Sequence, residues 1–333
     1  VTIVIAVVPL LLVAENGRDW GWDSSLAISM YVTGAIGIIA FLFIERKMGD
    51  DAILPLKLFK SRTFSMSTGI GVIVGVGMFG GMMTIPLILQ IVKGASPTEA
   101  GLLMIPMTIG MMTASMGSGI ITGRTGKYKI FMVLGTAMMT ISYVYFAQMK
   151  YDWSIWQISA GMVVMGLGLG QLMQTLTIAA QNAVEPRDIG VATSSSTFFR
   201  QMGGTAGVAV FLSILFATLA DKGSWIGEQI KLVLMAKPEL LTLPENAILK
   251  NTEVGGIADM VATDSSFLQK ISPEISEPIL IAFTEAGVSV FSAAAAVIFI
   301  GFVLTWFVKE VPLRQMSGVA AKAEEDAKAA SMH

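Results

Sequence analysis

Cysteine, histidine and charge are all scarce in this sequence of 333 residues. The absence of cysteine excludes disulfides, thiolate nucleophiles and thiolate metal sites, and the one histidine, His333, is the last residue. We therefore expect neither a metal site nor histidine chemistry. Charged residues make up only 14%, against roughly 25% in an average soluble domain, while 54% of the residues are hydrophobic. This deficit of charge predicts a chain that lies in lipid.

Several function classes lack their usual signals. The net charge of −2 and the scattered basic residues argue against a nucleic-acid partner. The sequence has no Gly-Lys-Ser/Thr loop of the kind that cradles ATP phosphates. It also shows no nucleophile with a base and no paired carboxylates, so we do not expect an enzyme.

Uncharged runs of about 20 residues, long enough for a helix to cross a hydrocarbon layer about 30 Å thick, recur along the chain. Counting eight crossings, the first incomplete, we predict an all-α, polytopic membrane helical bundle. The chain opens at Val1 without a basic stretch, as expected of a truncated chain or of an alternative initiation codon. The runs are 1–14, Leu26–Ile44, Phe64–Val92, Ala100–Ile121, Ile130–Gln148, Ile155–Ala183, Val191–Ala220 with Arg200 inside it, and Ala286–Val308.

Basic residues orient these crossings. Nine of them lie in short loops on one side and three, Arg18, Lys93 and Lys150, on the other. The positive-inside rule makes the first side cytoplasmic, which predicts a multi-pass protein of the cell membrane with a cytoplasmic C-terminus. The predicted segments are one incomplete and one complete helix in 1–44, a cytoplasmic loop 45–63, five transmembrane helices in 64–220, an extracytoplasmic loop 221–283, a final helix 284–308 and a cytoplasmic tail 309–333.

The long external segment contains one amphipathic stretch. Trp225, Ile226, Ile230 and Leu234 fall at helical spacing. This stretch is either a helix on the membrane surface or part of a loosely folded linker. The tail from Ala320 to His333 is either a solvated helix or disordered.

Glycines four residues apart recur inside the crossings. Small residues at this spacing let helix backbones approach closely in lipid. Pro86 and Pro106 each remove a backbone donor inside a long run, which favours a kink or a break. We predict packing and bending, rather than contact with a substrate, as the role of this set: Gly71 with Gly75, Gly77 with Gly81, Gly166 with Gly170, Gly203 with Gly207, and the two prolines.

Polar residues inside a crossing need a partner or a water-filled cavity. Gln171, Gln174 and Gln181 share one helix face by their spacing. Arg200 is a lone charge that either serves transport, snorkels to the interface, or pairs with carbonyls or an acid elsewhere. The candidates for a substrate path, with interhelical hydrogen bonding as the alternative, are Gln90, Gln171, Gln174, Gln181, Asn182, Arg200 and Gln201.

Four stretches of the sequence, in this order, carry a family resemblance: Trp20-Gly21-Trp22 with the later Pro55 to Phe59 (PLKLF), Gly166 to Gln181 (GLGLGQLMQTLTIAAQ), Gly190 to Gly207 (GVATSSSTFFRQMGGTAG) and Lys309 to Leu313 (KEVPL). They resemble the fourteen-helix drug/proton antiporters of the major facilitator superfamily (EmrB/QacA type). The resemblance implies the last eight of fourteen helices, namely the C-terminal six-helix bundle and the two central helices, without the family's first six-helix half.

The resemblance also implies a function, a secondary transporter that extrudes small hydrophobic or cationic compounds, with a proton as coupling ion and no other cofactor. Glu99, Asp188 and Glu285 fall at predicted ends of crossings, so the titrating acid is expected in the missing half. The partners would be the lipid bilayer, the substrate and that half. The alternatives are a truncated, non-transporting remnant or membrane scaffold and, on composition alone, an ion channel.

A degenerate copy of the superfamily's cytoplasmic loop motif lies between two crossings. The motif is a glycine and an acid followed by basic residues. Here the position of the acid is Gly123, which removes the carboxylate that a salt-bridge latch would need. The matching residues are Gly119, Gly123, Arg124, Gly126, Lys127 and Lys129.

Overall fold

The computed structural model describes residues 2–48, 54–243, 246, 268 and 271–313, and every regular element within them is a helix. Seven of these helical stretches are long and apolar enough to cross a membrane, which confirms a polytopic all-α bundle. They are α2 (Ser25–Met48), α3 (Arg62–Ile91), α4 with α5 (Pro97–Leu103 and Ile105–Thr125), α6 (Lys129–Phe146), α7 (Ile155–Asn182), α8 (Ile189–Asp221) with the short η3 (Pro186–Asp188), and α11 (Pro273–Trp306).

The first helix is shorter as an apolar segment than a membrane crossing requires. Helix α1 spans Thr2–Trp20, but only Thr2–Val13 forms its apolar part, so the predicted count of eight crossings is not confirmed. The predicted polar loop from Glu15 is mostly helical, since α1 continues to Trp20. The chain then turns at Gly21, whose φ of 80° suits glycine because it has no Cβ.

Serine side chains fix where three of the helices begin. The hydroxyl of Ser61 accepts a hydrogen bond from the amide of Phe64 at the start of α3. Ser96 with Glu99, and Ser154 with Gln157, form reciprocal capping boxes that satisfy free amides of α4 and α7. These local signals begin helices at the ends of the apolar runs.

The two prolines that we expected to kink or break helices differ in their effect. Pro106 lies in the first turn of α5, and the helix is interrupted just before it at Met104. Pro86 lies inside α3, which continues without a break to Ile91. A proline at a helix start costs no hydrogen bond, because the first amides of a helix have no intrahelical partner.

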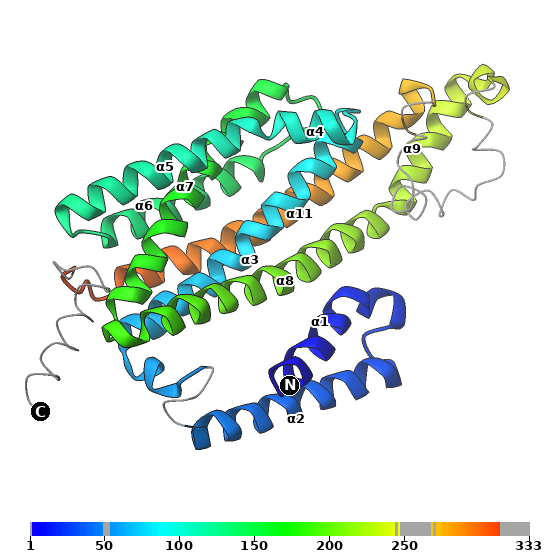
Figure 1. Ribbon diagram of the computed structural model, residues 1–333. Coiled ribbons are helices and arrows are strands. Elements are labelled where there is room, and N and C mark those ends of the chain that lie inside the picture. The colour runs from blue at the N-terminus through cyan, green and yellow to red at the C-terminus, as the bar shows by residue number, and fades with distance from the viewer. Residues whose placement is uncertain (1, 49–53, 244–245, 247–267, 269–270, 314–333) are drawn as a thin grey trace, which may run out of the picture.

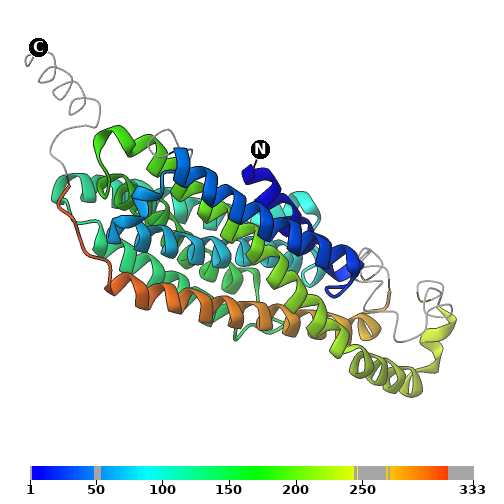
Figure 2. The same ribbon diagram turned by 90° about the horizontal axis from the view of Figure 1, so that it is seen from below.

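The helices form one elongated bundle with a separate hairpin (Figures 1 and 2). Helix α5 packs on α7, α6 on α7 and α11, and α3 on α8 and α11. Helices α1 and α2 pack on each other, and α1 contacts the bundle at α8. The rings of Tyr143 and Phe146 stack on Phe291 of α11 at the centre of the core. The bundle therefore presents one end near η3 and the chain after α11, and another near α9 (Gly223–Ala236).

At the α9 end, the structure extends the last helix beyond the predicted apolar run. Helix α11 begins at Pro273, thirteen residues before Ala286. Carboxylates of its first turns have partners there: Glu274 with Lys237 at 2.9 Å, Glu277 with the Tyr151 hydroxyl at 2.6 Å, and Glu285 with Lys222 at 2.5 Å. These contacts keep charged residues within a continuous helix.

The amphipathic stretch at Trp225 is a helix, as its spacing indicates, and not a loose linker. Its apolar face packs against the rest of the protein and is not available to a membrane surface, because Ile226 and Ile230 are buried in the main core. Helix α9 contacts α11 and is followed by η4 (Pro238–Thr242). Residues 244–245, 247–267 and 269–270 of the predicted external loop, and the predicted tail from residue 314 on, lie outside the described residues.

Candidate functional site

A short extended segment after α11 crosses one end of the bundle; we call residues 307–313 the strap and this end the strap end. Val308 is buried, and the Lys309 carbonyl accepts a hydrogen bond from the Thr63 hydroxyl of α3 at 3.2 Å. The Lys129 ammonium donates to the last-turn carbonyl of Trp306 in α11 at 2.8 Å. The strap thus links the start of α3, the end of α11 and the start of α6.

Tyr128 and Asn182 hold the centre of the strap. The Val311 amide donates to the Tyr128 hydroxyl at 3.0 Å, and the Asn182 side-chain amide donates to the carbonyls of Val311 and Pro312 at 2.8 and 3.0 Å. Burial raises the pKa of the Tyr128 phenol, so its hydroxyl stays protonated. Asn182, which we placed among the path candidates, is therefore hydrogen-bonded to the strap.

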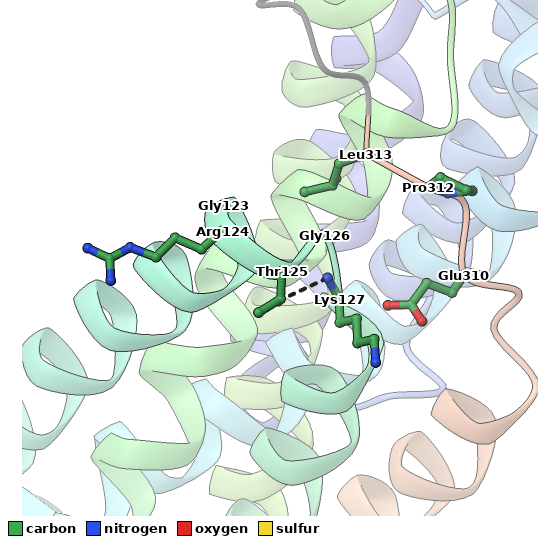
Figure 3. Close-up of a pocket in the computed structure, with 8 residues that line it drawn as sticks. All are labelled: Gly123, Arg124, Thr125, Gly126, Lys127, Glu310, Pro312 and Leu313. Carbon is green, nitrogen blue, oxygen red and sulfur yellow. Dashed lines mark hydrogen bonds between the residues drawn. The ribbon is translucent and has the colours of Figure 1, made fainter.

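The loop motif lies beside the strap and lines a pocket of about 820 Å³ with it (Figure 3). Gly126 ends α5 in the left-handed conformation at φ 73°, which aims the chain into α6. In Figure 3 the Arg124 side chain points away from the strap. The pocket is formed by Gly123, Arg124, Thr125, Gly126, Lys127, Glu310, Pro312 and Leu313.

Glu310 brings a carboxylate to a motif that has glycine at the position of its acid. One oxygen of Glu310 accepts a hydrogen bond from the Lys129 amide at 3.1 Å, in the first turn of α6. The residue before this helix, Tyr128, makes no side-chain cap. A carboxylate at a helix N-terminus satisfies a free amide and complements the helix dipole. The acid comes from a segment far along the chain, which the spacing of the motif could not indicate.

A second arrangement of interest is the contact between α3 and α8, where glycines bring the backbones together. A Cβ at Gly75 would collide with the carbonyl of Arg200, and one at Gly203 would collide with the backbone of Val72. Gly207 lies in the same way against the backbone of Val76. Gly71 is looser, since its Cβ would stand 4.0 Å from that of Arg200.

The other predicted glycine pairs, in α7 and α3, also lie at contacts between helices. Gly166 and Gly170 lie against backbone atoms of Met107 and Met111 in α5. Gly77 of α3 lies against the Ile298 side chain of α11, and its carbonyl accepts a hydrogen bond from the Tyr143 hydroxyl, which lies next to Gly81. The glycines therefore lie at helix contacts, against backbones or large side chains.

The glutamines that we expected on one stripe of α7 have different surroundings. Gln171 is buried, donates to the Leu167 carbonyl and to the Met138 sulfur, and its carbonyl oxygen has no partner in the structure. Gln174 is exposed beside Gly119. Gln181 donates to the Thr193 hydroxyl of α8 at 3.0 Å. They do not line one continuous path.

Arg200 is the one charged residue among the path candidates. Its side chain is largely buried, and among the described residues no carboxylate or carbonyl pairs with its guanidinium. Gln201, the next residue, is exposed, and Gln90 near the other end of α3 is half-buried. The structure therefore does not bring Arg200 and the glutamines into one cluster.

The hydroxyls of Thr63, Tyr128 and Tyr143 and the carboxylate of Glu310 were missed as interaction sites by sequence reasoning. A signal existed for Tyr143, because a phenol inside an apolar helix needs an acceptor. In the part of the chain that the structure describes, no group of three or more His, Asp or Glu side chains could hold a metal ion.

The sequence profile of the Major Facilitator Superfamily matches residues 2–208, more than half of the chain. The chain belongs to this superfamily. It is 33% identical over 306 residues to a tetracycline resistance determinant of Streptomyces rimosus, covering 91% of this chain and 88% of that protein. It is 32% identical over 343 residues to the multidrug transporter protein MdtP of Bacillus subtilis, covering 99% of this chain and 61% of that protein.

This major facilitator chain spans 42% of a third relative, the uncharacterized MFS-type transporter Rv1877 of Mycobacterium tuberculosis, to which it is 33% identical over 93% of its own length. It thus spans less than two thirds of two of these relatives. Membership of a family of transporters, together with seven apolar helices, places it in the cell membrane and marks it as a transport protein and not an enzyme.

Proposed function

We propose that this chain forms part of a proton-coupled drug efflux transporter of the fourteen-helix type. The main support is the match along 91% of the chain to a tetracycline resistance determinant, joined by the match to a multidrug transporter. The substrates would be small hydrophobic or cationic compounds. Such substrates suit the apolar, methionine-rich helices, because methionine adapts its shape to varied ligands.

In this proposal the bundle of α3 to α11 is the C-terminal six-helix half, and α1 and α2 are the two central helices. The hairpin of α1 and α2, which touches the bundle at α8, is consistent with that division. The strap end would face the cytoplasm, since the basic residues Arg124, Lys127 and Lys129 lie there. A first six-helix half would complete the transporter, in keeping with the share of the longer relatives that the chain spans.

The transport step would be a rocking motion between two states that expose a site near the midplane to either side. Helices in close backbone contact, such as α3 with α8 and α5 with α7, would move as rigid units. The polar groups that are not tied to the strap would contact the substrate at separate points and not along one continuous line. They are Gln90, Gln171, Gln174, Gln181, Arg200 and Gln201.

The test is efflux of a fluorescent cationic dye from membrane vesicles. It compares this chain alone with the chain joined to the first half of the Bacillus subtilis transporter, with and without a proton gradient. Efflux that stops when a protonophore collapses the gradient supports proton-coupled export. A well-inserted fusion that moves no dye under either condition contradicts drug export and leaves the reading of a non-transporting remnant.

A further inference from the structure

Arg200 is a charged side chain placed inside the bundle without a counter-charge. It is only 7% exposed, and no hydrogen bond or ion pair of its guanidinium occurs among the described residues. A charge buried in lipid or protein without a partner is costly, and partners for such groups are the rule in membrane proteins. The buried guanidinium of Arg200 therefore requires an anionic partner that the described residues do not supply.

The direction of the Arg200 side chain follows from the helix pairing. Contacts along α3 and α8 advance together, from Gly71 with Arg200 to Val76 with Gly207, so the two helices run parallel. Side chains on a helix tilt toward its N-terminus. From this tilt we infer that the Arg200 side chain leaves α8 toward the strap end, past Gly71 and toward the preceding turn of α3.

That preceding turn carries Thr68, which lies three residues before Gly71 on the same face. The Thr68 hydroxyl is buried and has no hydrogen-bond partner within the described part of the chain. Ser196, four residues before Arg200, is also buried and lies on the same face of α8. Arg200, Thr68 and Ser196 are therefore three buried polar residues on the facing sides of α3 and α8.

These groups together favour an anion. A guanidinium is a donor only, and its planar fork matches the two oxygens of a carboxylate. Two partly or fully buried carboxylates are already engaged elsewhere, since Asp188 at the start of α8 pairs with Lys57 at 3.4 Å and Glu45 of α2 accepts from the Leu54 amide at 3.0 Å. The counter-charge thus does not come from these acids.

We propose that Arg200, Thr68 and Ser196 form a carboxylate-binding site between α3 and α8. This inference rests on the proposed transport function, because the carboxylate belongs either to a transported substrate or to an acidic side chain of a second helix bundle. A substrate carboxylate would make zwitterionic amphiphiles a substrate class. Both sources share one chemistry, two oxygens held by the guanidinium fork with a hydroxyl beside it.

The test measures equilibrium binding of radiolabelled dodecanoate, with dodecanamide as the uncharged probe, to the purified chain in nanodiscs without any gradient. We expect dodecanoate to bind at least about tenfold more tightly than the amide, the size of one charge-assisted contact. Arg200→Gln should abolish this preference and Thr68→Val should reduce it several-fold. Thr205→Ala, an exposed position of α8 outside the proposed path, should leave it unchanged.

Circular dichroism checks that each variant keeps its helix content, and Thr68→Val keeps the test decisive where Arg200→Gln misfolds. The same assay on the fused protein separates the two sources. Binding to both the chain and the fusion indicates a substrate carboxylate, whereas binding to the chain alone indicates that an acid of the second bundle fills the site. Equal binding of both probes to the chain, unaffected by either variant, overturns the proposal. Because no transport is measured, this result is independent of whether the fusion exports dye.

Discussion

Replacing Gly75 by alanine should destabilise the bundle, although the same change six residues earlier should not. A Cβ at Gly75 would lie 3.0 Å from the Arg200 carbonyl carbon and 3.2 Å from the Gly204 amide nitrogen. The Arg200 carbonyl oxygen would be closer still. These are backbone atoms of α8, so no side chain can rotate away and the two helices must separate. Gly69, also in α3, has nothing within 4 Å of its Cβ position.

The magnitude follows from two opposed effects. Alanine stabilises an exposed helix position by up to about 1 kcal/mol relative to glycine. Overpacking a tight contact costs roughly 1–3 kcal/mol. Gly75→Ala should therefore lower the free energy of unfolding by about 1–2 kcal/mol. Gly69→Ala should raise it by up to about 1 kcal/mol.

The assay is reversible unfolding of the purified chain in mixed micelles, followed by circular dichroism as the denaturing detergent increases. Gly69→Ala serves as the matched control because it changes the same helix by the same atom. If Gly75→Ala proves as stable as Gly69→Ala, the backbones of α3 and α8 are not in contact. The packing argument would then be wrong for this helix pair.

Four further predictions follow from single contacts. Asn182→Ala removes two hydrogen bonds to the strap and should speed thiol labelling of Leu313→Cys, a substitution that gives this cysteine-free chain a single thiol. Asn16→Ala, which removes an exposed hydrogen bond within α1, should not change the labelling rate. Because burial raises the pKa of Tyr128, the unfolded chain releases this proton first, so stability should fall as pH rises above about 10, and Tyr128→Phe should flatten that fall in a detergent melt. Gln171→Met removes a buried oxygen that has no described partner, together with the bonds that the side-chain amide donates to the Leu167 carbonyl and the Met138 sulfur, and should raise the unfolding free energy by about 1 kcal/mol. A loss of stability would mean that the donated bonds outweigh the unpaired oxygen. Lys222→Ala breaks a half-exposed ion pair with Glu285 and should cost under about 1 kcal/mol, with a larger loss contradicting a screened surface pair.

The class of this protein and most of its helices can be predicted from the amino-acid sequence alone. Uncharged runs such as Phe64–Val92 and Ile155–Ala183 coincide with α3 and α7 to within a few residues, because a membrane helix must satisfy every backbone group internally and cover itself with apolar side chains. That requirement is local, so it can be read along the chain. The prediction was wrong where a charge has a partner from another part of the chain. The predicted crossing begins after Glu285, whereas α11 begins at Pro273 and Glu285 pairs with Lys222.

Which polar groups form hydrogen bonds or ion pairs depends on how the helices pack, and the sequence does not show it. Asn182 and Gln181 are neighbours in the sequence and were given the same role, yet one bonds the strap 129 residues away and the other bonds Thr193. Glu310 reaches the α5–α6 turn from 181 residues beyond Lys129, and Arg200 is left without any described partner. Hydrogen bonds and ion pairs act between groups brought together by helix packing, and neither spacing nor composition records which helices become neighbours.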